Sequence, residues 1–227
     1  MTQIDLADLN KPRIIRQISL ALDAADIIRL LGHHAKKTPS PKLIESIDTI
    51  RNLAYSLVNP KGVYCIFEAS SLKEISSQIS EHLAIAVVTI GPELENEVTK
   101  LNQTGRLQEA TILDAFGSQF SENAAAYIQC LIDETIRGSI LSSFHSTERK
   151  SPGYPGLPLE LQKDIFHLLP AHEIEVTLNA SCMMHPRKSI SFLSNLESSD
   201  SSDKKKSKPC ARCPLTHCSM RVSQRSY

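Results

Sequence analysis

The chain has 227 residues, of which 41% are hydrophobic and 22% charged, as is typical of a globular protein with one sizeable core. Basic and acidic residues number 25 each, so the overall charge favours neither nucleic acid nor an anionic membrane as a partner. The longest apolar run, Leu83 to Ile90, is too short to span a bilayer, and acidic residues open the chain where a signal peptide needs basic ones. We therefore expect a cytoplasmic protein.

The sequence divides near Leu196 into a patterned body and a polar end. Residues 1–196 carry periodic apolar positions and are expected to form one folded domain. Residues 197–209 are rich in serine, aspartate and lysine, cannot bury a core, and are expected to form a flexible linker. Residues 210–227 form a separate cysteine-rich tail.

Within the body, β-branched runs indicate strands and apolar residues at helical spacing indicate helices. The expected strands are 18–22, 62–69, 83–91, 174–179 and 189–193. The expected helices are 23–32 capped by Asp23, 40–59 opened by Ser40-Pro41, 72–82, one that begins at Pro92, 107–140 with a break near Gly117, and 159–169. This order predicts a single mixed domain of the α+β class.

The stretch R-K-S-P-G-Y-P-G, residues 149–156, combines a permanent cation, an aromatic ring and two glycines. The guanidinium of Arg149 has the planar fork that suits a carboxylate. Gly153 lets backbone amides approach a ligand closely, and Tyr154 offers a ring face or a hydroxyl. These residues indicate a small anionic ligand with an aromatic or heterocyclic part. A proline-fixed surface turn with a solvated arginine is the alternative.

Several ordered motifs together resemble the activation (reactivation) domain of cobalamin-dependent methionine synthase in a stand-alone form. R-x-x-x-G-Y is similar to the family's S-adenosylmethionine-binding signature, and M-x-P-x-x-S-x-S at residues 184–191 is similar to a turn of that family. A-V-V-T-I-G-P-E-L-E and A-T-I-L-D-A-F-G-S-Q-F-S-E upstream resemble its strand and long helix. The resemblance covers roughly residues 15–195.

The resemblance implies a role for individual residues at a ligand site. Arg149 would bind the methionine carboxylate of S-adenosylmethionine, Ser151 lies at a position whose backbone meets the adenine or ribose, and Gly153 and Tyr154 lie beside the ligand. Asp114 and Glu122 match acidic positions on a helix that faces the corrinoid-binding partner, and a solvated helix face is the alternative for both. Met184, Pro186, Ser189 and Ser191 match the turn, where a purely structural role is the alternative. The acidic residue that contacts the ligand's amino group is not assigned between Asp5, Asp8 and Asp23.

The implied function is reactivation of a corrinoid. The factor would bind S-adenosylmethionine and support reductive methylation of cob(II)alamin, with an electron donor such as flavodoxin or ferredoxin. The chain contains no D-x-H-x-x-G cobalamin-ligand segment, so we expect it to act in trans on a separate corrinoid protein or methionine synthase module. Whether it counts as an enzyme is left open. The alternatives are a non-catalytic corrinoid-protein docking module and an iron–sulfur electron carrier.

The six cysteines fall into two groups. Cys65, Cys130 and Cys182 lie in apolar segments and are expected to be packed thiols. Cys210, Cys213 and Cys218 are close enough in sequence to bind one metal, with His217 as a candidate fourth ligand. A structural zinc site, an iron–sulfur cluster and free thiols remain open.

Overall fold

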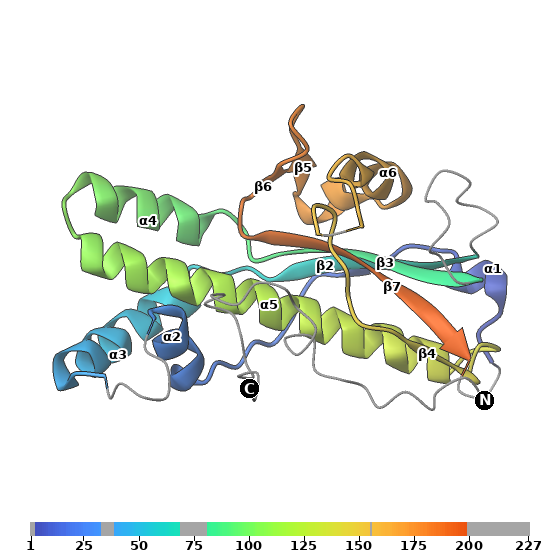
Figure 1. Ribbon diagram of the computed structural model, residues 1–227, viewed down its shortest axis with the longest axis horizontal. Coiled ribbons are helices and arrows are strands. Elements are labelled where there is room, and N and C mark those ends of the chain that lie inside the picture. The colour runs from blue at the N-terminus through green and yellow to red at the C-terminus, as the bar shows by residue number, and fades with distance from the viewer. Residues whose placement is uncertain (1–2, 33–38, 69–80, 155, 199–227) are drawn as a thin grey trace. The chain divides into compact units, whose positions relative to one another are not determined.

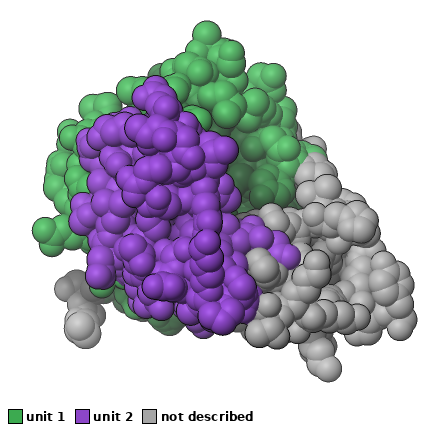
Figure 2. All heavy atoms as spheres, turned by 90° about the vertical axis from the view of Figure 1, so that its left-hand side faces the viewer, with its two compact units in different colours: residues 1–20, 58–92, 120–202 green, residues 21–57, 93–119, 203–227 purple. Residues whose placement is uncertain are grey.

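In the computed structural model, the described residues are 3–32, 39–68, 81–154 and 156–198. The chain forms two compact units, coloured separately in Figure 2. Among the described residues, the first unit comprises 3–20, 58–68, 81–92, 120–154 and 156–198, and the second comprises 21–32, 39–57 and 93–119. The long helix α5, Leu107–Arg137, contributes its first part to the second unit and the rest to the first.

The first unit is built on a five-stranded antiparallel sheet with the order β1-β2-β3-β7-β4. Its long strands β2, β3 and β7 lie side by side (Figure 1). The strands are β1 Arg13–Ile15, β2 Lys61–Glu68, β3 His82–Thr89, β4 Phe144–Ser146 and β7 Ser189–Ser198. All eight residues of β3 are buried, as expected for a central strand covered on both faces.

One face of this sheet packs against α5, and we call it the α5 face. Its core alternates along the strands with the period of two that a pleated sheet imposes. The sheet side chains in this core include Tyr64, Ile66, Ala84, Ala86, Val88, Phe192 and Leu196, and the helix supplies Ala124, Ala125, Ile128, Ile132 and Ile136. A Cβ atom on Gly62 of β2 would lie 2.7 Å from Cδ1 of Ile128, so glycine is what permits this close approach.

The opposite face, which we call the α6 face, packs against α6, Leu161–Leu168, and the short helix η2, Ala171–Ile174. Its buried side chains include Val63, Cys65, Phe67, Leu83, Ile85 and Val87 from the sheet, and Leu161, Ile165, Leu169 and Ile174 from the helical side. The same strands thus contribute side chains to two separate apolar cores, one on each face of the sheet.

The second unit consists of helices with their own buried positions. They are α2 Ala24–Leu30, α3 Pro41–Ser56, α4 Glu93–Gln103 and the first part of α5. Asp23 accepts a hydrogen bond from the Ala25 amide, and the Ser40 hydroxyl accepts one from the Leu43 amide, so both predicted N-caps are confirmed. The predicted α+β class and most of the helices are confirmed.

Two predicted strands are wrong. Residues 18–22 form no strand; the edge strand is β1, and Ile18 is buried without a ladder of hydrogen bonds. In the segment 174–179 only β5, Thr177–Leu178, is extended, paired with β6, Met184–His185, because Glu175 has a left-handed φ of 61° that interrupts the strand. Both segments are apolar enough to be buried, but burial does not require strand pairing.

The observed helices and strands differ from the predicted ones in several smaller respects. Helix α5 continues through Gly117 without the expected break. A short helix α1, Leu6–Leu9, and the edge strand β4 have no counterpart among the predicted elements. The predicted helix at 72–82 lies almost wholly outside the described residues, although His82 begins β3. None of the helices in the described ranges combines the length and apolar character that a membrane span requires.

Candidate functional site around Arg149

The segment after β4 stays on the edge of β7 but changes register. Ser146 pairs with Leu196, whereas Lys150 pairs with Leu193 through backbone hydrogen bonds of 2.8 and 2.9 Å. Four steps along this segment therefore match three steps along β7, and the one extra residue makes a β-bulge. Because bulges redirect side chains, this one sets the direction of Arg149.

The guanidinium of Arg149 is held between a ring and a carboxylate of the α5 face. Its Cζ lies 5.4 Å from the centroid of the buried Phe192 ring, within cation–π range. Its Nη2 donates a hydrogen bond of 3.2 Å to Oε2 of Glu122 on α5. The Arg149 side chain is 27% exposed, and no other described residue accepts a hydrogen bond from it. Its Nε and Nη1 donors are thus free to bind an incoming carboxylate.

The turn after Arg149 depends on glycine. Gly153 has a φ of 89°, and its amide donates to the Leu157 carbonyl at 2.9 Å. A Cβ atom there would meet Leu159 only at an ordinary 3.6 Å, so backbone conformation rather than lack of space requires glycine. The Tyr154 amide donates to the Ser151 carbonyl, which closes the turn, and the Tyr154 side chain is 63% exposed. The loop therefore presents an aromatic side chain to solvent.

The two acidic positions predicted on α5 have different surroundings. Glu122 lies in the first unit, where it contacts Arg149. Asp114 lies in the second unit and is exposed. The predicted partner-facing role stays a prediction for both, and the structure adds for Glu122 a contact that sequence reasoning did not anticipate.

Polar side chains of α5 also contact β4, close to the Arg149 bulge. Gln129 donates a hydrogen bond to the Ser146 hydroxyl, which in turn donates to the carboxylate of Asp133. Glu122, Gln129 and Asp133 follow one another at i, i+7 and i+11, the spacing of one helix face. That spacing is a sequence signal which could have identified this polar stripe.

The predicted turn at Met184–Ser191 packs on the α6 face and is satisfied internally. Oγ of Ser189 lies 2.7 Å from the Pro186 carbonyl oxygen and 2.9 Å from Oγ1 of Thr89. Ser191 donates a 2.7 Å hydrogen bond to Oε1 of Gln162 on α6. Because these serines are buried and bonded to the protein itself, their arrangement is that of a structural turn.

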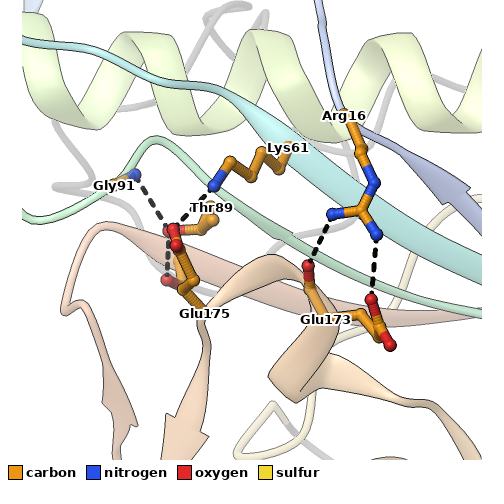
Figure 3. Close-up of polar contacts among 7 residues, drawn as sticks. Arg16, Lys61, Thr89, Gly91, Glu173 and Glu175 are labelled. Atoms are coloured by element: carbon orange, nitrogen blue, oxygen red, sulfur yellow. Dashed lines mark hydrogen bonds and ion pairs between the residues drawn. The ribbon is translucent and has the colours of Figure 1, made fainter.

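Two ion pairs fasten the neighbouring helix η2 to the rest of the first unit (Figure 3). Lys61 Nζ lies 2.6 Å from Oε2 of Glu175, and this hydrogen bond lowers the pKa of the Glu175 carboxyl. Arg16 donates from Nη2 to the Glu173 carboxylate at 2.9 Å and from Nη1 to its carbonyl at 3.2 Å. Thr89 accepts from the Gly91 amide at 3.1 Å, where the chain leaves β3. These contacts hold the architecture of the α6 face.

The three aspartates left open for the ligand's amino group have local roles in the structure. Asp5 accepts from the Asp8 amide and caps α1. Asp8 accepts a hydrogen bond from Lys11, which lowers the pKa of the Asp8 carboxyl. Asp23 caps α2. Each of these carboxylates is therefore already engaged within its own segment.

The cysteines of the described residues do not form a metal site. No group of three or more metal-ligating side chains occurs in the described ranges. Cys65 and Cys182 are buried as expected, and burial raises the pKa of the Cys65 thiol to about 12. Cys130 is exposed, so its prediction as a packed thiol is wrong; it lies on the outer side of α5. Cys210, Cys213 and Cys218 lie outside the described residues.

Comparison with known proteins gives both a family and a fold. The family model for the activation domain of vitamin B12 dependent methionine synthase matches residues 44–201, which run through both units. Among solved structures, the MetH reactivation domain bound to AdoHcy is similar with a TM-score of 0.58 and 15% sequence identity, over 86% of this chain and 81% of that one. At this identity the likeness shows the fold. No curated protein matches.

Proposed function

Since the chain belongs to the activation-domain family of vitamin B12 dependent methionine synthase, we propose that it binds S-adenosylmethionine at the Arg149 loop and supports reductive methylation of cob(II)alamin. A role in corrinoid reactivation is what the family match and the fold support together. The proposal adds the ligand, the site and action in trans on a separate corrinoid protein or methionine synthase module.

The observation that carries the proposal is the partly exposed guanidinium of Arg149. It rests over the Phe192 ring and keeps donors available among the described residues, as recognition of a carboxylate requires. The neighbouring solved domain is bound to AdoHcy, the molecule that remains when S-adenosylmethionine has lost its methyl group, and both carry the same amino-acid head. Arg149 is therefore proposed to bind the carboxylate of that head.

The remaining loop residues are proposed to position the rest of the ligand. The left-handed turn at Gly153 leaves the Ser151 amide and the Gly153 carbonyl without a backbone partner in the described structure, and these two groups are proposed to hydrogen-bond the adenine or ribose. The exposed ring of Tyr154 offers a face for stacking. The protein thus supplies binding and orientation of the sulfonium.

The methyl acceptor lies outside this chain in the proposed reaction. A corrinoid on the partner would accept the methyl group after a one-electron reduction by a donor such as flavodoxin or ferredoxin. The 227 residues contain no D-x-H-x-x-G segment that would ligate a cobalamin, which favours a corrinoid held elsewhere. Asp114 stays a proposed contact to that partner because it is an exposed acid on α5.

The cysteine tail carries the second candidate function, electron delivery. The observation that favours it is the C-x-x-C-x-x-x-x-C spacing of Cys210, Cys213 and Cys218. An absorption spectrum of anaerobically purified protein, together with metal analysis, distinguishes an iron–sulfur cluster, a zinc site and free thiols. Visible absorbance that is lost in Cys213→Ser would support an iron–sulfur cluster, and stoichiometric zinc in a colourless protein would support a zinc site. A colourless protein without zinc would support free thiols.

Isothermal titration with S-adenosylmethionine tests the proposed site. We expect saturable binding by the wild type and an approximately 100-fold loss of affinity in Arg149→Ala, because a charge-assisted contact contributes up to about 3 kcal/mol. Arg137→Ala, which removes an exposed arginine at the end of α5, is the matched control and should bind as the wild type does. A folded wild type that binds neither S-adenosylmethionine nor AdoHcy would refute the proposal.

A further inference from the structure

The second unit and the C-terminal end of the chain carry opposite surplus charges, and this carries an inference about an interaction surface on α3. We propose that residues 204–225, which we call the basic segment, dock on a groove along α3 of the same chain. The inference goes beyond the proposed function and does not depend on whether the Arg149 loop binds S-adenosylmethionine.

The groove lies within the second unit and has two walls. Ser46, Thr49 and Ile50 of α3 line one wall, and residues 105–109, where the chain passes from α4 to α5, line the other. This part has a volume of about 300 Å³. Thr49 also lines a second depression together with Glu45, one turn closer to the start of α3. We call the two adjoining depressions the α3 groove. Because it is elongated and open, it suits a segment of chain rather than an enclosed small ligand.

Two large apolar side chains in the lining of the α3 groove are exposed. Ile44 is 43% exposed and Leu107 is 61% exposed, whereas Ile47 of the same helix α3 is buried. A single exposed apolar residue is ordinary on a protein surface, but two that line adjoining depressions favour a bound segment. Leu215 and Met220 of the basic segment are side chains that can pack on them.

The charge of the second unit favours a basic occupant. Its described residues include nine acidic and five basic side chains, against thirteen and ten in the first unit, which has about twice as many described residues. Four of the five basic side chains pair with a carboxylate three positions away, among them Arg51 with Asp48 and Arg106 with Glu109 at the groove. Glu45 forms no ion pair with a described residue. The surplus negative charge is therefore available to an approaching cation.

The basic segment supplies the complementary charge. Its 22 positions hold seven basic residues and no acidic one, namely Lys204, Lys205, Lys206, Lys208, Arg212, Arg221 and Arg225. Exposed ion pairs are individually weak, but basic residues on one segment act together when that segment is attached to the surface that it binds. Attachment by a short linker gives an effective concentration on the order of millimolar, so contacts of modest affinity suffice.

The length of the chain permits this contact. Strand β7 ends at Ser198, and 29 residues follow it. Fully extended, they span up to roughly 95 Å. Helix α5, which runs through both units, is about 46 Å long. The segment can therefore reach the second unit from its attachment in the first.

Zero-length cross-linking of the full-length protein tests the inference. A carbodiimide joins a lysine amine to a carboxylate that it contacts, and peptide mass mapping of the monomer fraction identifies the linked residues. We expect lysines 204–208 to link to Glu45 and Asp48, with a yield that falls about fivefold in 1 M NaCl because exposed charges are screened. The double variant Glu45→Gln, Asp48→Asn should lose these links. Glu134→Gln, at an exposed glutamate of the part of α5 in the first unit, should retain them.

An NMR comparison covers contacts made through arginine, which a carbodiimide does not capture. Replacing the four lysines by glutamine in isotope-labelled full-length protein should shift backbone amides of residues 44–50 and 105–109 and leave those of β2 and β3 unchanged.

Three results would overturn the inference. Lysine links spread equally over first-unit carboxylates such as Glu148 and Glu197 would show that the basic segment has no preferred surface. Links found only in a covalent dimer would assign the α3 groove to a second copy of the chain. Unchanged amides at residues 44–50 and 105–109 in the lysine variant would show that the segment does not dock there. Each of these results leaves the proposed function intact.

Discussion

The Arg149 loop and the Met184–Ser191 turn both match family motifs and both adjoin β7, yet they use their polar groups in opposite ways. Along β7, Ser191 hydrogen-bonds Gln162 of α6, whereas the next residue, Phe192, lies under Arg149 on the α5 face. The turn satisfies its hydroxyls within the protein, but the loop leaves donors of Arg149 available in the described structure. The bonding of its side chains therefore distinguishes a motif whose polar groups are satisfied within the protein from one that keeps donors available for the proposed ligand.

The largest effect is expected from overpacking the α5 face. Gly62→Val places methyl groups where Ile128 and Val88 already lie within 3.2 Å of a Cβ position. We expect the free energy of unfolding to fall by about 3 kcal/mol and ligand affinity to fall as well, because α5 carries Glu122. Urea denaturation and titration check both. Gly62→Ala should cause a smaller loss, and an unchanged stability of Gly62→Val would contradict the packing described for α5.

A change in the turn should alter stability without altering binding. Ser191→Ala removes the donor to Gln162 and leaves a buried amide oxygen unsatisfied, which costs about 2 kcal/mol. Denaturant unfolding measures the loss, and AdoHcy titration should match the wild type. Ser142→Ala, at an exposed serine before β4, is the control and should be near neutral. A binding defect in Ser191→Ala at full folding would show that the turn belongs to the site.

A conservative change in the Arg149 loop should alter binding without altering stability. Arg149→Lys keeps the charge but loses the planar fork and the stacking of a guanidinium on Phe192. We expect affinity for AdoHcy to fall about tenfold with little change in melting temperature, because the Arg149–Glu122 pair is partly exposed. Arg137→Lys serves as control. A lysine variant that binds as tightly as the wild type would remove the argument for bidentate recognition.

The smallest effect is expected from a comparison of the buried thiols of Cys65 and Cys182 with the exposed thiol of Cys130 on α5. Burial raises the pKa of Cys65 to about 12, so at pH 8 its thiol stays protonated in the folded protein and becomes reactive only as the pH approaches that value. Iodoacetamide at pH 8 followed by peptide mass mapping should modify Cys130 long before Cys65 or Cys182. Binding and stability should not change. Rapid modification of Cys65 would contradict its packing.

Much of the fold could be predicted because its signals are local. Asp23 and Ser40 cap helices as their side chains suggest, and the β-branched run at 83–90 forms a buried strand. The failures at 18–22 and 174–179 arise from apolar residues that are buried without pairing, which alternation cannot distinguish from a strand.

The candidate site was only partly predictable for a related reason. R-x-x-x-G-Y identified Arg149, and the positive φ of Gly153 confirms the expected need for glycine there. The contact between Arg149 and Glu122 depends on a bulge and on helix packing across 27 positions of sequence, and no local pattern encodes it. The i, i+7, i+11 stripe of α5 was readable in the sequence, but its partner strand β4 was not.

The most direct test of the proposed ligand site is an NMR titration of isotope-labelled protein with S-adenosylmethionine. The proposed function requires saturable shifts of backbone amides in residues 149–157, together with the neighbouring positions of α5 around Glu122. In Arg149→Ala these shifts should disappear at the same ligand concentrations. Saturable shifts confined to other parts of the chain, or no shifts in a folded protein, would contradict binding at the Arg149 loop.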